Sequence, residues 1–290
     1  MKENKIAVIG LSGESIFMKM DHFNEEGETV VANTHHIEYG GKGYNQAVAA
    51  KRYGAEVSFL TVCGSDEIAN KVEDSLIKEN IKTTVIRKTG KSASACILID
   101  KQGRNRVICY PGVSSSMTKE DVYEFEEEIK TSKYLLLQFE MSDESLFEAI
   151  KLAKKHKTLV ILNPAPAKKL SMEILEDIYL LTPNEQEVEI LFGSTISNVS
   201  LDKKISNLVI TMGDKGSMLY ENDQVTLIPA KKVSPLNTTG AGDTYNGVLA
   251  ASLLEGNTLL EACKLASIAA SISVTKEFVM DSIPYRNEIK

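Results

Sequence analysis

The sequence lacks the features that would place it in a membrane or on a nucleic acid. None of its apolar runs is long enough to span a bilayer, and no signal-peptide core follows Met1. The formal net charge is −7, and basic residues form no run longer than pairs such as Lys154-Lys155 and Lys168-Lys169. We therefore expect a soluble cytoplasmic protein that binds neither nucleic acid nor an anionic membrane.

Cysteine is scarce, and its spacing fits neither a disulfide framework nor a metal site. The four cysteines form no Cys-x-x-Cys pair, and no histidine cluster has the spacing of metal ligands. Because each cysteine sits among apolar residues, we expect buried, reduced thiols, which fit the cytosol. The chain also contains no internal repeat, low-complexity tract or clear linker.

The chain has an ordinary globular composition, with 43% hydrophobic and 25% charged residues over 290 positions. Short apolar runs alternate with amphipathic runs of helical period. The expected strands are 6–9, 57–62, 134–138, 158–162, 179–181 and 208–212, with a late hairpin of 217–220 and 225–228. The expected helices are 44–53, 67–79, 119–130, 144–155, 172–177, 185–191, 242–254 and 259–276. This alternation predicts an α/β fold with a mostly parallel sheet covered by helices on both faces.

Two regions interrupt the alternation. Residues 29–38 have strand propensity without a preceding helix, and residues 94–110 have the pattern of a β-hairpin that turns at Asp100–Gly103. Together they could form a small antiparallel sheet, a lid over the carboxyl ends of the strands, where open α/β sheets bind ligands. They could also extend one edge of the main sheet. We expect a single domain, 1–290, with a lid formed discontinuously by residues 11–39 and 92–112.

The strongest local motif is Asn237-Thr-Thr-Gly240-Ala241-Gly242-Asp243, which precedes an apolar helical run. The two glycines allow a tight turn, and the first N–H groups of the helix then make an anion site that suits a phosphoryl group. A carboxylate at such a site repels phosphate unless it has a task, and accepting a proton from an attacking hydroxyl group is such a task. Asp243 could instead only cap the helix.

A second glycine-rich helix start is Gly40-Gly41-Lys42-Gly43-Tyr44-Asn45. Lys42 and Asn45 offer hydrogen-bond donors, and Asn45 also offers an acceptor, which suits a polyhydroxylated ligand. The segment is not a phosphate-binding P-loop, because Gly43 rather than Ser or Thr follows Lys42. A solvated Lys42 and a capping Asn45 are the alternative.

Three further motifs follow predicted strands. In Thr182–Glu187, Asn184 and Glu187 suit a helix capping box, and the same residues could lie near Mg²⁺ and phosphate, through water. The segment Thr211–Gly216 suits either a turn around a nucleotide or a plain connection. Asn163–Ala167, with the sequence Asn-Pro-Ala-Pro-Ala, would shape the carboxyl edge of the sheet as a turn.

In their order and spacing, these motifs resemble the PfkB family of carbohydrate kinases, its ribokinase branch most closely. The resemblance runs over essentially the whole chain. It implies a ribokinase-like fold with a β-sheet lid, ATP as phosphoryl donor, Mg²⁺ as cofactor and a sugar as acceptor. It also implies a homodimer formed through the lid.

The resemblance assigns roles by position. Asp243 is implied as the base that deprotonates the acceptor hydroxyl group. The N–H groups of Gly240, Ala241 and Gly242 are implied to hold the charge that develops on the phosphoryl group. The implied sugar contacts are Gly41, Lys42, Asn45, Glu140 and, in place of an aspartate, Ser15. The implied nucleotide contacts are Asn184, Thr211, Gly213, Gly216 and Ser267, and Glu187 is implied near Mg²⁺ through water.

The sequence departs from the family pattern at two sites. The family has Asn-x-Asp after the first strand, and that Asp binds sugar hydroxyl groups; here Gly13 and Ser15 stand in those places, with Glu14 between them. Losing the charged acceptor would cost about 1.5–3 kcal/mol. Asn237 stands where the family has an Asp that helps to bind K⁺, and Phe278 stands where it has a glycine. We therefore predict weak or absent activation by K⁺.

Three functions remain open from the sequence. The first is a kinase that phosphorylates a hydroxyl group of a sugar or sugar derivative. The second is a nucleoside kinase of the same fold, because the missing Asp changes the sugar site. The third is a catalytically silent sugar-binding protein, against which Asp243 argues, since binding alone does not need a carboxylate beside an anion site.

Overall fold

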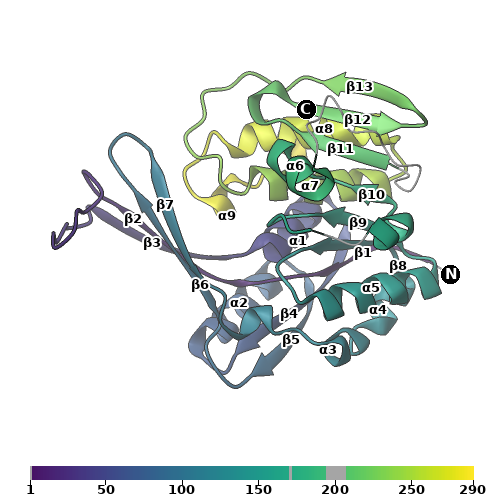
Figure 1. Ribbon diagram of the computed structural model, residues 1–290, viewed down its shortest axis with the longest axis horizontal. Coiled ribbons are helices and arrows are strands. Elements are labelled where there is room, and N and C mark those ends of the chain that lie inside the picture. The colour runs from purple at the N-terminus through teal and green to yellow at the C-terminus, as the bar shows by residue number, and fades with distance from the viewer. Residues whose placement is uncertain (1, 170–171, 194–206) are drawn as a thin grey trace.

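A nine-stranded sheet forms the centre of the protein (Figure 1). The computed structural model describes residues 2–169, 172–193 and 207–290. The strands of this sheet are β1 (Glu3–Ile9), β4 (Glu56–Gly64), β5 (Lys82–Lys88), β8 (Ser132–Gln138), β9 (Leu159–Asn163), β10 (Leu180–Leu181), β11 (Asn207–Thr211), β12 (Ser217–Glu221) and β13 (Gln224–Ile228). Their order is β13-β12-β11-β10-β9-β8-β1-β4-β5, and only the β11–β12 and β12–β13 pairs are antiparallel.

Helices cover both faces of this sheet, because its central strands are apolar on both sides. On one face lie α1 (Lys42–Tyr53), α2 (Glu67–Lys78), α7 (Ala241–Leu254) and α8 (Leu259–Ser273). On the other lie α3 (Lys119–Tyr123), α4 (Glu126–Thr131), α5 (Asp143–His156) and α6 (Glu185–Phe192). Within β1, Ile6 and Val8 belong to the first core, and Ala7 and Ile9 belong to the second. The predicted α/β class is confirmed.

Several short helices complete the fold. Helix α9 (Val279–Ser282) follows α8 near the end of the chain. The 3₁₀ turns are Gly112–Ser115, Met172–Asp177, Gly213–Lys215 and Arg286–Glu288. In the described part of the chain, no helix has the length and apolar character needed to cross a membrane.

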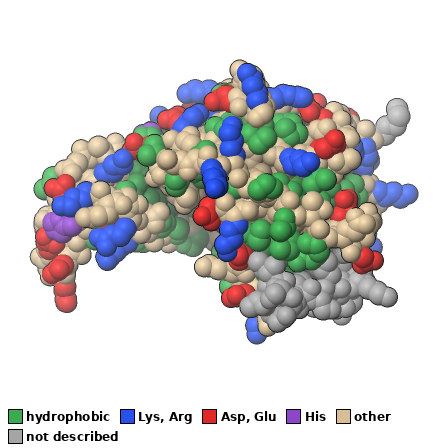
Figure 2. All heavy atoms as spheres, turned by 90° about the horizontal axis from the view of Figure 1, so that it is seen from above, with side chains coloured by type: hydrophobic (Ala, Val, Ile, Leu, Met, Phe, Trp, Pro, Cys, Tyr) green, Lys and Arg blue, Asp and Glu red, His purple; other side chains and the backbone are tan. Residues whose placement is uncertain are grey.

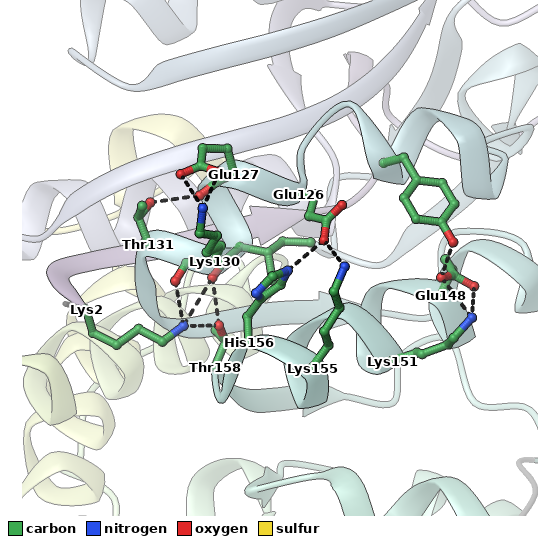
Figure 3. A network of polar contacts seen from close by, with 12 residues as sticks. Lys2, Glu126, Glu127, Lys130, Thr131, Glu148, Lys151, Lys155, His156 and Thr158 are labelled. Atoms are coloured by element: carbon green, nitrogen blue, oxygen red, sulfur yellow. Dashed lines mark hydrogen bonds and ion pairs between the residues drawn. The ribbon is translucent and has the colours of Figure 1, made fainter.

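Polar side chains close the amino-terminal edge of the sheet, on the side away from the carboxyl ends of the parallel strands (Figure 3). Lys2 donates to the Lys130 carbonyl oxygen at 2.8 Å and to Thr158 Oγ1. Glu126 accepts a hydrogen bond from Lys155 at 2.7 Å. The Lys2 contacts tie the start of β1 to α4 and to the residue before β9, and the Lys155–Glu126 pair ties α5 to α4. An exposed ion pair of this kind contributes roughly 0–1 kcal/mol, so it stabilises the helix ends more than it determines the fold.

A second sheet projects from one side of the main body (Figures 1 and 2). Its strands are β2 (Gly13–Lys19), β3 (Thr34–Gly40), β6 (Ala93–Ile99) and β7 (Asn105–Tyr110), in the order β3-β2-β6-β7. Figure 2 shows it as an arm with acidic side chains toward its free end.

The strand register gives the arm two distinct faces, because successive side chains alternate. The inner face carries the cross-strand row Ser15, Glu38, Ala95 and Cys109. Phe17 and Ile97 on this inner face pack against Val279. The outer face carries the row Ile16, Ile37, Cys96 and Ile108.

The structure differs from the predicted elements in several places. The sheet of the arm is mixed rather than antiparallel, because β2 runs parallel to β6. The helix predicted at 119–130 is broken into α3 and α4, because Phe125 leaves the helical conformation and buries its ring. Strand β3 starts only at Thr34, so the first half of the predicted segment 29–38 precedes it. The sequence pattern misses β2, which begins with the small and polar residues of Gly13–Ser15, and β5, which is only half-buried.

The expectation of four buried thiols holds for two of them. All four cysteines are free; Cys63 and Cys263 are buried, and Cys96 is half-buried. Cys109, however, is exposed on β7, because the whole of this edge strand is exposed. Apolar neighbours in the sequence therefore do not guarantee burial in an edge strand.

Candidate active site

Three segments meet at the carboxyl ends of β1 and β8: the loop after β1, the start of α1 and the start of α7. From β1 the chain adds β4 and β5 on one side of the sheet, and later it adds β8 and β9 on the other side of β1. The strand order therefore reverses between β1 and β8, and open α/β sheets bind ligands at such a reversal. The packing is close, because a Cβ atom added at Gly10 would lie 2.2 Å from Gln138 Oε1 and 2.8 Å from Gly43 Cα. Glycine at Gly10 and Gly43 therefore lets α1 start directly on the sheet.

Helix α7 begins at a glycine turn. Gly240 is the N-cap residue with φ +78°, a conformation that favours glycine, and no side chain caps the helix. A Cβ atom added at Gly242 would meet no atom within 4 Å, and Ala241 and Gly242 both line a cavity. An uncapped helix start that faces a cavity favours a negatively charged group.

Asp243 lies in the first turn of α7 with its carboxylate buried. Asn45 Nδ2 donates to Oδ2 at 2.9 Å, and Gln46 Nε2 donates to Oδ1 at 3.1 Å. Burial raises the pKa of Asp243, although the charge of Lys42 and the two amide donors act in the opposite direction. Because the N-cap is Gly240, Asp243 does not cap its own helix.

Gln46 links Asp243 to the sheet. Its Nε2 also lies 3.2 Å from Asn163 Oδ1, and its Oε1 accepts from Gln138 Nε2 at 2.7 Å. Asn163 in turn donates to the Thr182 carbonyl oxygen at 2.9 Å, so the Asn163–Ala167 segment contributes a side chain to the network as well as a turn.

Gln46 and Gln138 belong to this network, and sequence reasoning missed both. Gln46 directly precedes the apolar residues 47–50 and Gln138 ends an apolar strand, so each is a buried polar residue at one end of an apolar run. That is the signal that could have found them. A single uncharged amide carries no pattern of its own, however, and only the fold brings the two together.

Lys42 and Glu140 lie beside Asp243. The backbone N–H of Lys42 donates to Glu140 Oε2 at 3.0 Å. Attraction to Asp243, and more weakly to Glu140, raises the pKa of Lys42, whereas burial raises the pKa of Glu140. Asn45 Oδ1 is buried without a hydrogen-bond partner in the part of the chain that the structure describes. A buried acceptor left unpaired is suited to a donor from a ligand.

The predicted capping box of α6 is confirmed. The backbone N–H of Glu187 donates to Asn184 Oδ1 at 2.8 Å, and that of Asn184 donates to Glu187 Oε2 at 2.7 Å. Burial raises the pKa of Glu187, and both Lys42 and Asp243 lie close enough to act on it. Among the described residues, no group of three or more His, Cys, Asp or Glu side chains is arranged to hold a metal ion by itself.

A cavity of about 560 Å³ opens beside the start of α7. Its volume is in the range of small-molecule sites, ~300–1,000 Å³. It brings together four of the five predicted nucleotide contacts, namely Thr211, Gly213, Gly216 and Ser267. The fifth, Asn184, does not line it but pairs with Thr211 in an isolated β-bridge. Lys231 and Lys232 also line the cavity, although nothing in the sequence distinguishes them from the other basic pairs.

Ser15 lies on the inner face of the arm, in register with Glu38, and its Oγ is 3.8 Å from the position of a Cβ atom added at Gly40. Glu14 lies on the outer face, where burial and the nearby Glu14 carboxylate raise the pKa of Tyr39. Glu14 therefore does not take the place of the aspartate that the family pattern has two residues after Gly13.

Asn237 joins the α7 motif to the segment that follows α8. Its Nδ2 donates to the Glu277 carbonyl oxygen at 2.7 Å, and its Oδ1 accepts from the Thr239 N–H at 3.0 Å. A K⁺ ion would need oxygen ligands at this junction, whereas an amide donor already joins the two segments. These residues do not fit a monovalent cation.

The fold and the site together define the class: an ATP-dependent carbohydrate kinase, a phosphotransferase with an alcohol group as acceptor. The chain belongs to the pfkB family of carbohydrate kinases, whose family model matches residues 3–286. It is 36% identical over 294 residues to the ribokinase of Haemophilus influenzae, covering 98% of this chain and 96% of that protein.

Solved structures agree with this assignment. The ribokinase of Thermotoga maritima has a TM-score of 0.87 and 34% identity, covering 98% of this chain and 97% of its own. A ribokinase of Arabidopsis thaliana, complexed with ribose and ATP, has a TM-score of 0.87 and 25% identity, covering 100% of this chain and 98% of its own.

Proposed function

We propose that Asp243 is the base in the transfer of the γ-phosphoryl group of ATP to a hydroxyl group of a sugar or sugar derivative. The acceptor O–H gives its proton to the carboxylate, its oxygen bonds to the γ-phosphorus, and the bond from phosphorus to the leaving ADP oxygen breaks. The raised pKa of Asp243 favours this proton transfer. The observation that carries the proposal is a buried carboxylate, held by Asn45 and Gln46, at an uncapped helix start.

The N–H groups of Gly240, Ala241 and Gly242 are proposed to hold the charge that develops on the phosphoryl group. They lie at the positive end of α7, and fixed donors of this kind act without reorganising during the reaction. ATP is proposed to occupy the adjacent cavity, in contact with Thr211, Gly213, Gly216 and Ser267, with Asn184 near the phosphates. Lys231 and Lys232 would add positive charge at its rim.

Mg²⁺ is the proposed cofactor, and Glu187 fits it. One carboxylate oxygen of Glu187, Oε2, caps α6, and the carboxylate lies close enough to Lys42 and Asp243 for their charges to act on its pKa. Burial raises the pKa of Glu187, and a nearby cation would favour its charged form. Mg²⁺ keeps most of its water, so we propose contact through water. When bound, the ion would neutralise charge on the phosphate groups.

The acceptor is proposed to lie between α1 and the inner face of the arm. The proposed contacts are Gly41, Lys42, Asn45, Glu140 and Ser15, and Asn45 Oδ1 offers an acceptor without a partner among the described residues. The arm would then act as a lid. We further propose that turnover needs no K⁺, that two copies associate through the arm, and that the protein is cytoplasmic, which its four free cysteines support.

The decisive variant is Asp243→Asn, tested after wild-type ATP turnover has been screened with pentoses, hexoses and nucleosides in the presence of Mg²⁺. We expect turnover to fall on the order of 10²–10⁴-fold, because the acceptor proton loses its base. Binding of ATP, measured by calorimetry, should remain. Asp223→Asn removes an exposed carboxylate from the β12–β13 turn and serves as control. Wild-type turnover in Asp243→Asn would show that Asp243 is not the base.

A further inference from the structure

The inner face of the arm holds the segment that follows α8, residue by residue. Lys19 pairs with Glu277 at 2.5 Å. The ring of His36 stacks on that of Phe278, with 3.7 Å between centroids and 20° between planes. Phe17 also meets Phe278, edge to face, at 5.6 Å. These contacts fix residues 277 and 278 against strands β2 and β3.

Glu38, on β3, holds the next two residues. Its Oε1 accepts from the Val279 N–H at 3.1 Å, and its Oε2 accepts from the Met280 N–H at 3.1 Å. These two N–H groups begin α9, whose N-cap residue Phe278 supplies no side-chain cap. The Glu38 carboxylate, from strand β3 of the arm, therefore caps this helix. Burying the Glu38 carboxylate without such partners would be costly, so its position depends on the two N–H groups of α9.

Val279, whose N–H binds Glu38, also contacts the start of α7. A Cβ atom added at Gly240 would lie 2.6 Å from Val279 Cγ1, so the valine side chain rests directly on the N-cap residue of α7. Asn237, three residues earlier, is bound to the Glu277 carbonyl oxygen. The segment 277–280 is therefore fixed to the arm on one side and to both ends of the Asn237–Gly240 loop on the other.

We infer that Glu38 is a positioning residue, which holds the start of α7 in register with the arm through Val279. It touches neither Asp243 nor the nucleotide cavity, and the inference rests on the proposal that the α7 N–H groups hold the transferred phosphoryl group. In this arrangement, a shift of the arm moves α9, and the movement of α9 changes the support under Gly240.

The test compares Glu38→Gln, Val279→Ala and their double variant in the full-length protein. Glu38→Gln turns one acceptor into a donor that faces a backbone N–H, and Val279→Ala removes the contact with Gly240 while leaving Glu38 intact. We expect each to lower kcat on the order of tenfold to a hundredfold, because small misplacements in a catalytic site have large effects. The KM for ATP should stay unchanged, since the adenosine end of the cavity is not involved. The fold-decrease in kcat of the double variant should be smaller than the product of the fold-decreases of the two single variants.

Binding of ADP with Mg²⁺ and aluminium fluoride gives a second readout, because this complex mimics the phosphoryl group in transfer. We expect both variants to bind ADP like wild type and to lose the extra affinity for the aluminium fluoride complex. Asp121→Asn is the control, because Asp121 caps α3 through the Thr118 N–H at 2.7 Å. It should change thermal stability alone.

Three outcomes would overturn the inference. The first is wild-type kcat and wild-type affinity for the aluminium fluoride complex in Val279→Ala, which does not depend on how well Glu38→Gln folds. The second is multiplicative losses in the double variant. The third is a wild-type protein without turnover or extra affinity for the complex, which would identify the proposed function itself as the point of failure.

Discussion

Asp243 has a pKa raised by burial, although Lys42 and two amide donors favour its charged form. A carboxyl group whose pKa is higher in the folded protein than in the unfolded chain binds its proton more tightly in the folded state. The free energy of unfolding is therefore highest while the group is protonated. It falls as pH rises from the unfolded pKa, near 3.8, through the raised folded pKa.

Asp243→Asn should be free of this loss. We expect the free energy of unfolding of the variant, minus that of wild type, to be larger at pH 8 than at pH 4, as measured by urea denaturation. Burial raises the pKa values of Glu140 and Glu187, and so does the charge of Asp243. The variant removes the contribution of Asp243 to both, which changes the difference in the same direction. Asp223→Asn should show no such pH dependence. A difference that stays constant or shrinks with pH would contradict the prediction.

At the scale of residues, the sequence identifies charged and glycine positions better than neutral polar ones. Asp243 and Glu187 stand in motifs whose chemistry is visible in one dimension, and the structure places both at one site. Gln46 is equally central, yet its role depends on Gln138 and Asp243, which are 92 and 197 residues away. Such a partnership is a property of the fold, so no local pattern encodes it.

Helices α1 and α7 are in close contact at Gly247, and this contact holds Asn45 and Gln46 near Asp243. A Cβ atom added at Gly247 would lie 2.4 Å from the Gln46 carbonyl oxygen and 2.6 Å from Ala49 Cβ. The backbone of α1 cannot yield without moving the whole helix. The spacing of two helices thus depends on one missing methyl group.

Gly247→Ala should therefore lower both stability and turnover. We expect a loss of about 1–3 kcal/mol in the free energy of unfolding, as for other overpacked cores, and a reduced kcat as Asn45 and Gln46 move from Asp243. Gly242→Ala, in the same helix, is the control for stability alone, because its Cβ would meet no atom within 4 Å. Equal stability of the two variants, measured by urea denaturation, would contradict the argument.

The junction between Asn237 and Glu277 leads to a prediction about cations. Because the Asn237 amide already donates to the Glu277 carbonyl oxygen, we expect adding K⁺ to enzyme in K⁺- and Na⁺-free buffer to leave turnover unchanged. Asn237→Asp would place a carboxylate oxygen against that carbonyl oxygen and should lower turnover in the same buffer. A strong rise in wild-type turnover on adding K⁺ would refute the prediction.

At the scale of elements, the sequence predicts buried helices and central strands well because their apolar patterns are continuous. It fails where an element is only half-buried. Strand β5 is half-buried over most of its length, and β2 begins with Gly13–Ser15, which have little strand propensity. The break between α3 and α4 arises from the burial of Phe125, a tertiary contact that helical periodicity does not report.

At the scale of the whole molecule, pairing between distant strands decides what the sequence left open. Strand β2 is parallel to β6, with Gly13 opposite Ala93, and β3 lies at the other side of β2. This register makes a separate sheet rather than an extension of the main one. It also decides that Ser15, and not Glu14, shares the inner face with Glu38, which composition and periodicity could not settle.

The outer face of the arm presents an apolar row where a monomer would expose it. Ile37 is 42% exposed and Ile108 65% exposed, and β7, which carries Ile108, is exposed throughout. An exposed apolar row next to an open edge strand is suited to pairing with another chain. A second copy of the chain can cover this row, because in a two-fold symmetric dimer the apolar rows of the two copies pack against each other.

We therefore expect wild type to be a dimer by light scattering and Ile108→Asp to be a monomer, because a charge at the β7 end of the row would be buried in the interface without a partner. The matched control is Leu227→Asp: Leu227 is also 65% exposed, but it lies on β13 at the far edge of the main sheet. This control should remain a dimer. A wild-type monomer at working concentration, or a dimeric Ile108→Asp, would show that the outer face of the arm is not the interface.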